Sequence, residues 1–298
     1  MKHSMTNNLF HHVTETLRRP EKSTVSYRLI RQCSKAMWVL IAILITGCAA
    51  KEAAEPSLTP FEVEDKIGFV DAQSNIIISP RYDWSSSFRE GLCAVKEGDK
   101  VGFINARGEV VVPIMYDTAL NFSEGLAGVC INKECGYVDA QGNTLIPFTF
   151  SQVDYFRKHK SNLAIVRKGR AWGAIDQSGK IIFEIRYDDP PLIEDGFAIV
   201  TENGKKGLLN SSGEEVAPLK YDAIAYNVWG GRLLNEDLFS VNLGGKWGFL
   251  DTRGKVQVPF RYEQRSFFSG DYAIVQREGK TYRINKSGKE TPYNAAPY

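Results

Sequence analysis

The feature that most constrains this chain is a motif that recurs along nearly its whole length. It is clearest in residues 246–255, where Trp247-Gly248 is followed by Asp251 and Gly254. The same pattern surrounds six glycines, which we term anchor glycines: Gly68, Gly102, Gly136, Gly173, Gly207 and Gly248. A seventh, degraded copy has Tyr282 in place of glycine, and successive copies are 34, 34, 37, 34, 41 and 34 residues apart. A period of this length indicates a tandem repeat protein.

Each unit carries hairpin-turn residues just after its anchor position. Asp or Asn lies three residues further on, and glycine follows three residues later in six of the seven units; the first unit has Ser74-Asn75. These turns need positive φ, which Gly, Asn and Asp tolerate at low cost. The acidic members could alternatively be catalytic carboxylates, but their place ahead of turn glycines favours turn hydrogen bonding. The seven residues are Asp71, Asn105, Asp139, Asp176, Asn210, Asp251 and Asn285.

An aromatic residue and a closing strand complete each unit. Segments such as residues 91–95 and 196–200 combine small and branched apolar residues at strand length. We therefore expect three strands of about five residues per unit, with a fourth short strand near the aromatic residue. One aromatic per unit favours core packing over a carbohydrate-stacking stripe. The six residues are Tyr82, Tyr116, Phe150, Tyr187, Tyr221 and Tyr262.

These patterns predict an all-β fold, a tandem array of about seven antiparallel β repeats of 34–41 residues. Residues 61–65 match the closing strand of a unit, and residues 281–285 match an opening hairpin, so the two ends could pair and close a propeller-like ring. However, 34 residues is short for a four-stranded blade, and an open array tolerates uneven units better. The open, curved or superhelical array is favoured, and the closed ring remains the alternative.

The motif resembles that of the WG (or KWG) repeat family, through Trp172-Gly173 and Trp247-Gly248. The tryptophan is replaced by Ile67, Val101, Cys135 and Lys206 in other units. The resemblance covers about residues 61–292. It implies a scaffold or interaction module, because repeats of this kind are similar to such modules.

Residues 1–47 have the features of a lipoprotein signal peptide. They carry a net charge of +5, against −3 for the remainder, and residues 36–45 are an uninterrupted apolar run. That run is about half the length needed to cross a bilayer. Ile45-Thr46-Gly47-Cys48 resembles a lipobox, which implies acylation at Cys48; the alternative is an ordinary secretory signal. The long polar lead in residues 1–24 suggests an over-extended start.

Residues 48–60 are small, polar and proline-bearing, so they are expected to form a lipidated tether before a repeat domain at 61–298. The predicted location is the cell envelope, with lipid anchoring to a membrane. Alanine rather than aspartate at position 49 favours the outer membrane if the cell is Gram-negative.

The sequence offers little machinery for catalysis. His159 is the sole histidine after residue 47, which argues against histidine-based metal sites and Ser–His or Cys–His pairs. We therefore expect no enzyme activity, no metal and no cofactor. A mildly acidic body without basic runs argues against nucleic acid as a partner.

Two cysteines form a candidate disulfide. Cys130 and Cys135 bracket a short hairpin loop, and a bond between them is plausible in an oxidising compartment; the alternative is two unrelated small side chains. Cys93 is expected to be a buried, inert thiol.

A candidate partner-binding loop lies in the 41-residue unit. Its seven extra residues fall within 226–237, which include Trp229 and Arg232, residue types enriched in interface hot spots. The alternative is that Trp229 fills a gap in the core. The sequence thus favours a surface-tethered, non-enzymatic protein interaction scaffold, with a carbohydrate- or peptidoglycan-binding module as the alternative.

Overall fold

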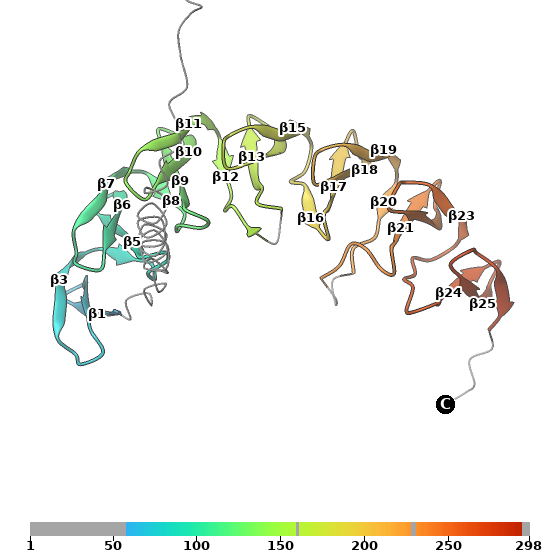
Figure 1. Cartoon of the computed structure of the whole chain (residues 1–298), viewed down its shortest axis with the longest axis horizontal. Coiled ribbons are helices and arrows are strands. Elements are labelled where there is room, and N and C mark those ends of the chain that lie inside the picture. Colours follow the sequence, from blue (N-terminus) through green and yellow to red (C-terminus); the bar gives the residue numbers. More distant parts are fainter. Residues whose placement is uncertain (1–57, 159–160, 228–230, 294–298) are drawn as a thin grey trace, which may run out of the picture. The chain divides into compact units, whose positions relative to one another are not determined.

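Twenty-six β-strands form seven small antiparallel sheets in the computed structural model, which describes residues 58–158, 161–227 and 231–293. No α-helix occurs in those ranges, and no sheet in them is closed. Each sheet is made of strands that are consecutive in the chain, as the colours of Figure 1 show. The all-β tandem repeat expected from the sequence is therefore confirmed.

The first three sheets contain, in order, β1 (Thr59–Val63), β2 (Lys66–Val70) and β3 (Ile76–Tyr82); β4 (Trp84–Ser85), β5 (Leu92–Glu97), β6 (Lys100–Asn105) and β7 (Val110–Tyr116); and β8 (Thr118–Ala119), β9 (Leu126–Ile131), β10 (Glu134–Asp139) and β11 (Thr144–Phe150). The fourth and fifth contain β12 (Gln152–Val153), β13 (Ala164–Lys168), β14 (Ala171–Ile175) and β15 (Ile181–Tyr187); and β16 (Leu192–Glu194), β17 (Phe197–Glu202), β18 (Lys205–Asn210) and β19 (Glu215–Tyr221). The last two contain β20 (Ala223–Ile224), β21 (Leu238–Leu243), β22 (Lys246–Asp251) and β23 (Val256–Tyr262); and β24 (Tyr272–Arg277), β25 (Lys280–Asn285) and β26 (Glu290–Pro292).

The sheets are offset from the sequence units. The closing strand of one unit pairs with the anchor strand of the next, as β5 does with β6, so each of the first six units contributes to two consecutive sheets. At the chain ends, β1 pairs with β2 and β25 pairs with β24, within their own sheets. The ring alternative required the two end strands to pair with each other, and they do not. The first strand starts at Thr59, inside the expected tether, because Thr59 and Pro60 pair with Val70 and Phe69.

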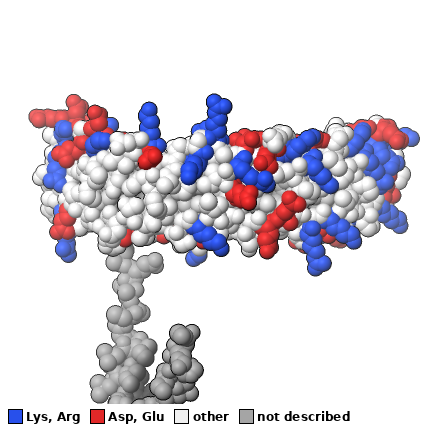
Figure 2. Space-filling view, turned by 90° about the horizontal axis from the view of Figure 1, so that it is seen from above, with Lys and Arg blue, Asp and Glu red and all other residues white. Residues whose placement is uncertain are grey.

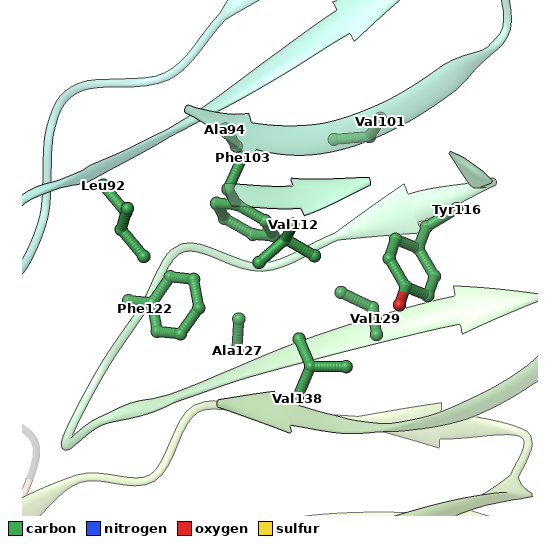
Figure 3. Packing of buried hydrophobic residues seen from close by; sticks show 10 residues of the cluster. All are labelled: Leu92, Ala94, Val101, Phe103, Val112, Tyr116, Phe122, Ala127, Val129 and Val138. Carbon is green, nitrogen blue, oxygen red and sulfur yellow. The ribbon is translucent and has the colours of Figure 1, made fainter. Parts of the chain in front are cut away.

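Hydrophobic side chains bind each sheet to its neighbours in the chain. Alternate residues of β5 point to opposite sides: Ala94 packs toward the third sheet and Cys93 toward the first. Figure 3 shows the cluster that joins the second and third sheets, with Phe103 from the second and Ala127 and Val129 from the third. Burying a side chain such as Phe103 contributes about 1.5–3 kcal/mol. An apolar run buried on both faces is thus the reason these short strands lack polar alternation.

Candidate functional site

The recurring Asp and Asn residues are structural turn residues. In all seven units the side-chain Oδ1 accepts hydrogen bonds from the backbone N–H groups two and four residues further on, at 2.8–3.1 Å. The residue three positions on has positive φ, 78° at Gly108 and 64° at Ser74. The side-chain amide of Asn75 lowers the pKa of Asp71, and that of Asn143 lowers the pKa of Asp139. These carboxylates are held by the turn that they stabilise.

The repeated aromatic residues lie in the core. All six are at most 7% exposed, and Tyr82 and Tyr262 are completely buried. Each pairs across the sheet with the residue before an anchor glycine, as Tyr116 does with Val101. They provide no surface stripe on which sugar rings could stack.

The six anchor glycines are buried, one in each of the first six sheets, where the strand that follows the anchor strand passes close over it. A Cβ atom on Gly102 would lie 2.6–2.7 Å from backbone atoms of Pro113 and Ile114. The obstacle is thus the next strand of the same sheet, not an adjacent unit. The ladder shifts register at this point, between Val101 and Phe103. In the last sheet the ladder runs without a shift, which explains why Tyr282 fits where glycine is otherwise required.

A Lys–Asp contact that the sequence analysis missed links consecutive sheets at three places in the array. Lys66, Lys100 and Lys205 each donate to an aspartate 17 residues further on, at 2.5–2.6 Å: Asp83, Asp117 and Asp222. The other oxygen of each carboxylate accepts a backbone N–H from the next hairpin turn, at 2.6–2.7 Å. The lysine hydrogen bond is the largest cause of the lowered pKa of each aspartate. The sequence signal for this contact is an aspartate directly after the repeated aromatic residue.

Both units that exceed 34 residues place their extra length in the same loop, the one between the short first strand and the closing strand of a sheet. In the second and third sheets this loop spans residues 86–91 and 120–125, but in the fourth and sixth it spans 154–163 and 225–237. We call the surface made by these equivalent loops the loop face. The repeat scaffold is therefore constant while the loop face varies, as expected of a recognition surface.

A buried phenylalanine anchors several loops of the loop face in the hydrophobic core. The sequence analysis also missed this feature. Phe122 packs edge-on against Phe103 of the preceding sheet, with ring centroids 4.9 Å apart. Phe88, Phe156 and Phe268 occupy the equivalent position and make equivalent ring contacts. The 34-residue spacing of Phe88, Phe122 and Phe156 was visible in the sequence.

Carboxylates tie the loops of neighbouring units together. Glu90 accepts hydrogen bonds from the N–H groups of Glu124 and Gly125, at 2.7 and 2.9 Å. Asp195 does the same for Leu233 and Leu234 in the long loop, at 3.0 and 3.1 Å. The loop face is thus held in place from one unit to the next.

The candidate partner-binding residues lie in the longest loop. Arg232 is exposed and pairs through its backbone with Asn227, while Trp229 lies outside the described residues. Leu233 is completely buried in the cluster between the fifth and sixth sheets. Leu233 therefore anchors this loop to the core. The sequence analysis did not single out this residue.

The two candidate disulfide residues face each other in the β9–β10 hairpin. Their sulfur atoms are 2.12 Å apart and their Cα atoms 4.0 Å apart. Asp117 donates its N–H to the Cys130 carbonyl from the other side, which makes Cys130–Cys135 the close, non-hydrogen-bonded type of cross-strand pair. Cys93 is a buried thiol, and burial raises its pKa to about 11. Cys48 and His159 lie outside the described residues.

A hollow of about 450 Å³ opens on the loop face, where three consecutive loops meet. Within the described ranges, no group of His, Cys, Asp and Glu side chains is placed to hold a metal ion. In the same ranges, no helix is long and apolar enough to span a membrane. On the face shown in Figure 2, both signs of charge are interspersed over much of the surface, with Lys and Arg gathered toward the C-terminal sheets.

Three solved structures resemble this chain only distantly. A eukaryotic initiation factor is 11% identical with a TM-score of 0.38, covering 79% of this chain and 72% of that chain. Kluyveromyces lactis Hsv2 is 11% identical with a TM-score of 0.30, covering 66% and 70%. Citrobacter koseri AztD is 11% identical with a TM-score of 0.24, covering 79% and 85%. Likenesses of this size establish no function.

A search of curated proteins found no match. The model of the family described as "WG containing repeat" matches six consecutive segments, residues 67–100, 102–135, 136–170, 172–205, 207–247 and 247–280. Its segments begin at or near the anchor glycines, and together they span most of the repeat array. The chain therefore belongs to the WG-containing repeat family.

Proposed function

We propose that this chain is a non-enzymatic protein interaction scaffold of the cell envelope, tethered to a membrane by lipid at Cys48. The single observation that carries the scaffold role is the position of the extra residues. Both long units add them to the loop face, in loops 154–163 and 225–237, while the stacked sheets keep one geometry. A repeat array that varies one face and conserves the rest is built for recognition.

The envelope location rests on the sequence of the leader. The basic residues, the apolar run and Ile45–Cys48 occur in the order required for a lipoprotein signal. From Cys48 to the first strand at Thr59 the chain can reach about 35 Å when extended. The Cys130–Cys135 bond supports an oxidising compartment, since structural disulfides persist there.

Fatty-acid labelling tests the anchor. The wild-type protein should incorporate labelled palmitate and sediment with membranes, whereas the Cys48→Ser variant should do neither. Stable anchoring needs more than one acyl chain, at about 0.8 kcal/mol per buried CH₂ group. Labelling that persists in Cys48→Ser would exclude the lipoprotein assignment.

Retrieval of envelope proteins tests the scaffold role. Wild-type protein and a variant carrying Trp229→Ala and Arg232→Ala are compared by quantitative pull-down from solubilised envelopes. The matched control is Thr252→Ala with Arg253→Ala, in a turn away from the loop face. A partner that is retained by the control and lost by the loop variant, at unchanged Tm, supports the proposal. Equal retrieval by all three proteins would contradict the assignment of this loop.

The carbohydrate-binding alternative has less support. It needs aromatic rings exposed along one groove, but the six repeat aromatics are buried. Protein partners are therefore the preferred ligands.

A further inference from the structure

The hollow on the loop face has a cation at its wall. Arg89 is exposed, and within the described residues no hydrogen bond or ion pair engages its guanidinium group. Its backbone is fixed by two reciprocal hydrogen bonds with Leu92, at 2.7 and 2.9 Å. The neighbouring Glu90 directs its carboxylate to the amides of Glu124 and Gly125. Arg89 is therefore placed at the hollow by a rigid turn while its planar donor group remains available.

The rest of the lining is polar at the walls and apolar at the floor. Phe122 is only 4% exposed and forms part of the buried root of its loop. Ser123 uses its hydroxyl to donate to the Phe156 carbonyl at 2.7 Å. Asn121 and Tyr155 are half-buried, and neither side chain has a hydrogen-bond partner among the described residues. The groups that can receive a ligand are thus one guanidinium, one amide, one phenol and an aromatic edge.

This set of groups selects for a carboxylate on an extended chain. A guanidinium binds a carboxylate through two parallel hydrogen bonds, and a side-chain amide pairs with the donors and acceptors of a peptide backbone. A hollow of about 450 Å³ has the volume of a small-ligand site and admits one or two side chains. Position 123 carries the small Ser123 where equivalent positions carry Arg89 and Arg157, and Ser123 is part of the lining of the hollow.

We propose that the hollow lined by Arg89, Asn121 and Tyr155 binds an aspartate or glutamate side chain in an extended segment of a protein partner. This assignment rests on the proposed function as an interaction scaffold and names the chemistry of its partner. Arg89 takes the carboxylate, Asn121 takes the adjoining peptide group and Tyr155 packs against the chain. A saccharide is disfavoured because Tyr155 is the single partly exposed ring in this lining.

Fluorescence anisotropy with defined probes tests the assignment on the full-length protein. The probe is a fluorescein-labelled peptide of alternating glutamate and glycine; matched probes carry glutamine in place of glutamate. Arg89→Ala and Asn121→Ala are compared with the control Arg253→Ala, which removes an equal charge from an exposed turn. We expect Arg89→Ala to weaken the affinity for the glutamate peptide at least tenfold, and Asn121→Ala to weaken it several-fold. Arg253→Ala should bind the glutamate peptide as the wild type does. The wild type should bind the glutamine peptide as weakly as Arg89→Ala binds the glutamate peptide.

Two results would overturn the assignment, provided that thermal melting shows each variant to be folded. The first is equal binding of the glutamate peptide by wild type and Arg89→Ala. The second is tighter, Arg89-dependent binding of oligogalacturonate, which would assign the hollow to acidic saccharides. Retrieval of an envelope partner that depends on the 225–237 loop, together with no Arg89-dependent peptide binding, would reject this inference and leave the proposed function standing.

Discussion

Glu90 accepts a 2.7 Å hydrogen bond from the backbone N–H of Glu124, the residue one full repeat further along the chain. The two residues occupy the same turn in consecutive units, and both have positive φ, at 51° and 55°. The repeat period therefore brings a carboxylate to a turn amide of the next unit. This contact couples neighbouring loops without using the hydrophobic core.

Replacing Glu90 with Asn tests that coupling. Asn tolerates positive φ but is too short to reach the next turn. We expect Glu90→Asn to lower Tm by about 2–4 °C, the range for a loss near 1 kcal/mol in a domain of this size. Thermal unfolding followed by circular dichroism measures the change. Glu97→Asn, at an exposed position, should leave Tm unchanged; a similar decrease there would show that charge alone is responsible.

Gly102→Ala tests the packing of the anchor glycines. The new methyl group would meet Pro113 and Ile114 backbone atoms at 2.6–2.7 Å, and backbone cannot move aside as a side chain can. We expect a loss of about 1–3 kcal/mol in the free energy of unfolding, measured by urea titration. Gly98→Asn is the control, since Gly98 has a φ of 61° and no atom near its Cβ position. If both changes cost the same, steric exclusion is not what requires glycine at 102.

A contact in this fold can be predicted from the sequence when its two residues lie close together along the chain. The turn role of Asp71 is readable because its partners lie two and four residues away. The burial of Tyr82 follows from one aromatic per unit. The Lys205–Asp222 contact becomes visible only when the strand register places residues 17 apart side by side.

The candidate site is less predictable because it depends on the stacking of sheets. Arg89, Asn121 and Tyr155 lie on three different loops, and none belongs to the repeated motif. Nothing local in the sequence indicates that these side chains line one hollow. The extra length within residues 226–237 was readable from the sequence, but the burial of Leu233 in that loop was not.

Acid should weaken the Lys–Asp contacts. The pKa of Asp222 is lowered chiefly by the hydrogen bond from Lys205, so its contribution is present above the ordinary pKa of 3.8 and is lost as pH falls below that value. The Tm difference between wild type and Asp222→Asn should therefore be constant near neutral pH and vanish in stronger acid. Added salt should reduce it, because both groups are partly exposed. Asp99→Asn should show no such pattern, and a difference independent of pH would contradict the mechanism.

The three cysteines of the repeat domain should differ in reactivity. Burial raises the pKa of Cys93 to about 11, so its thiol should resist iodoacetamide in the folded protein and react on unfolding. Cys130 and Cys135 should react only after unfolding and reduction together. Peptide mapping by mass spectrometry distinguishes the three sites. Labelling of Cys130 in unfolded, unreduced protein would show that the bond is absent.

The long loop provides a test that separates fastening from recognition. Leu233 is completely buried between the fifth and sixth sheets, and Asp195 holds its amide at 3.0 Å. Leu233→Ala should therefore cost about 2–5 kcal/mol in the free energy of unfolding, as other buried leucines do. Arg232 is exposed on the adjoining position, so Arg232→Ala should change that free energy by less than about 0.5 kcal/mol.

Urea titration of both variants measures the contrast. A large decrease in the free energy of unfolding for Leu233→Ala, with none for Arg232→Ala, shows that Leu233 anchors the loop while Arg232 is available to a partner. A large loss for Arg232→Ala would instead assign Arg232 to the fold and remove it from the candidate binding surface.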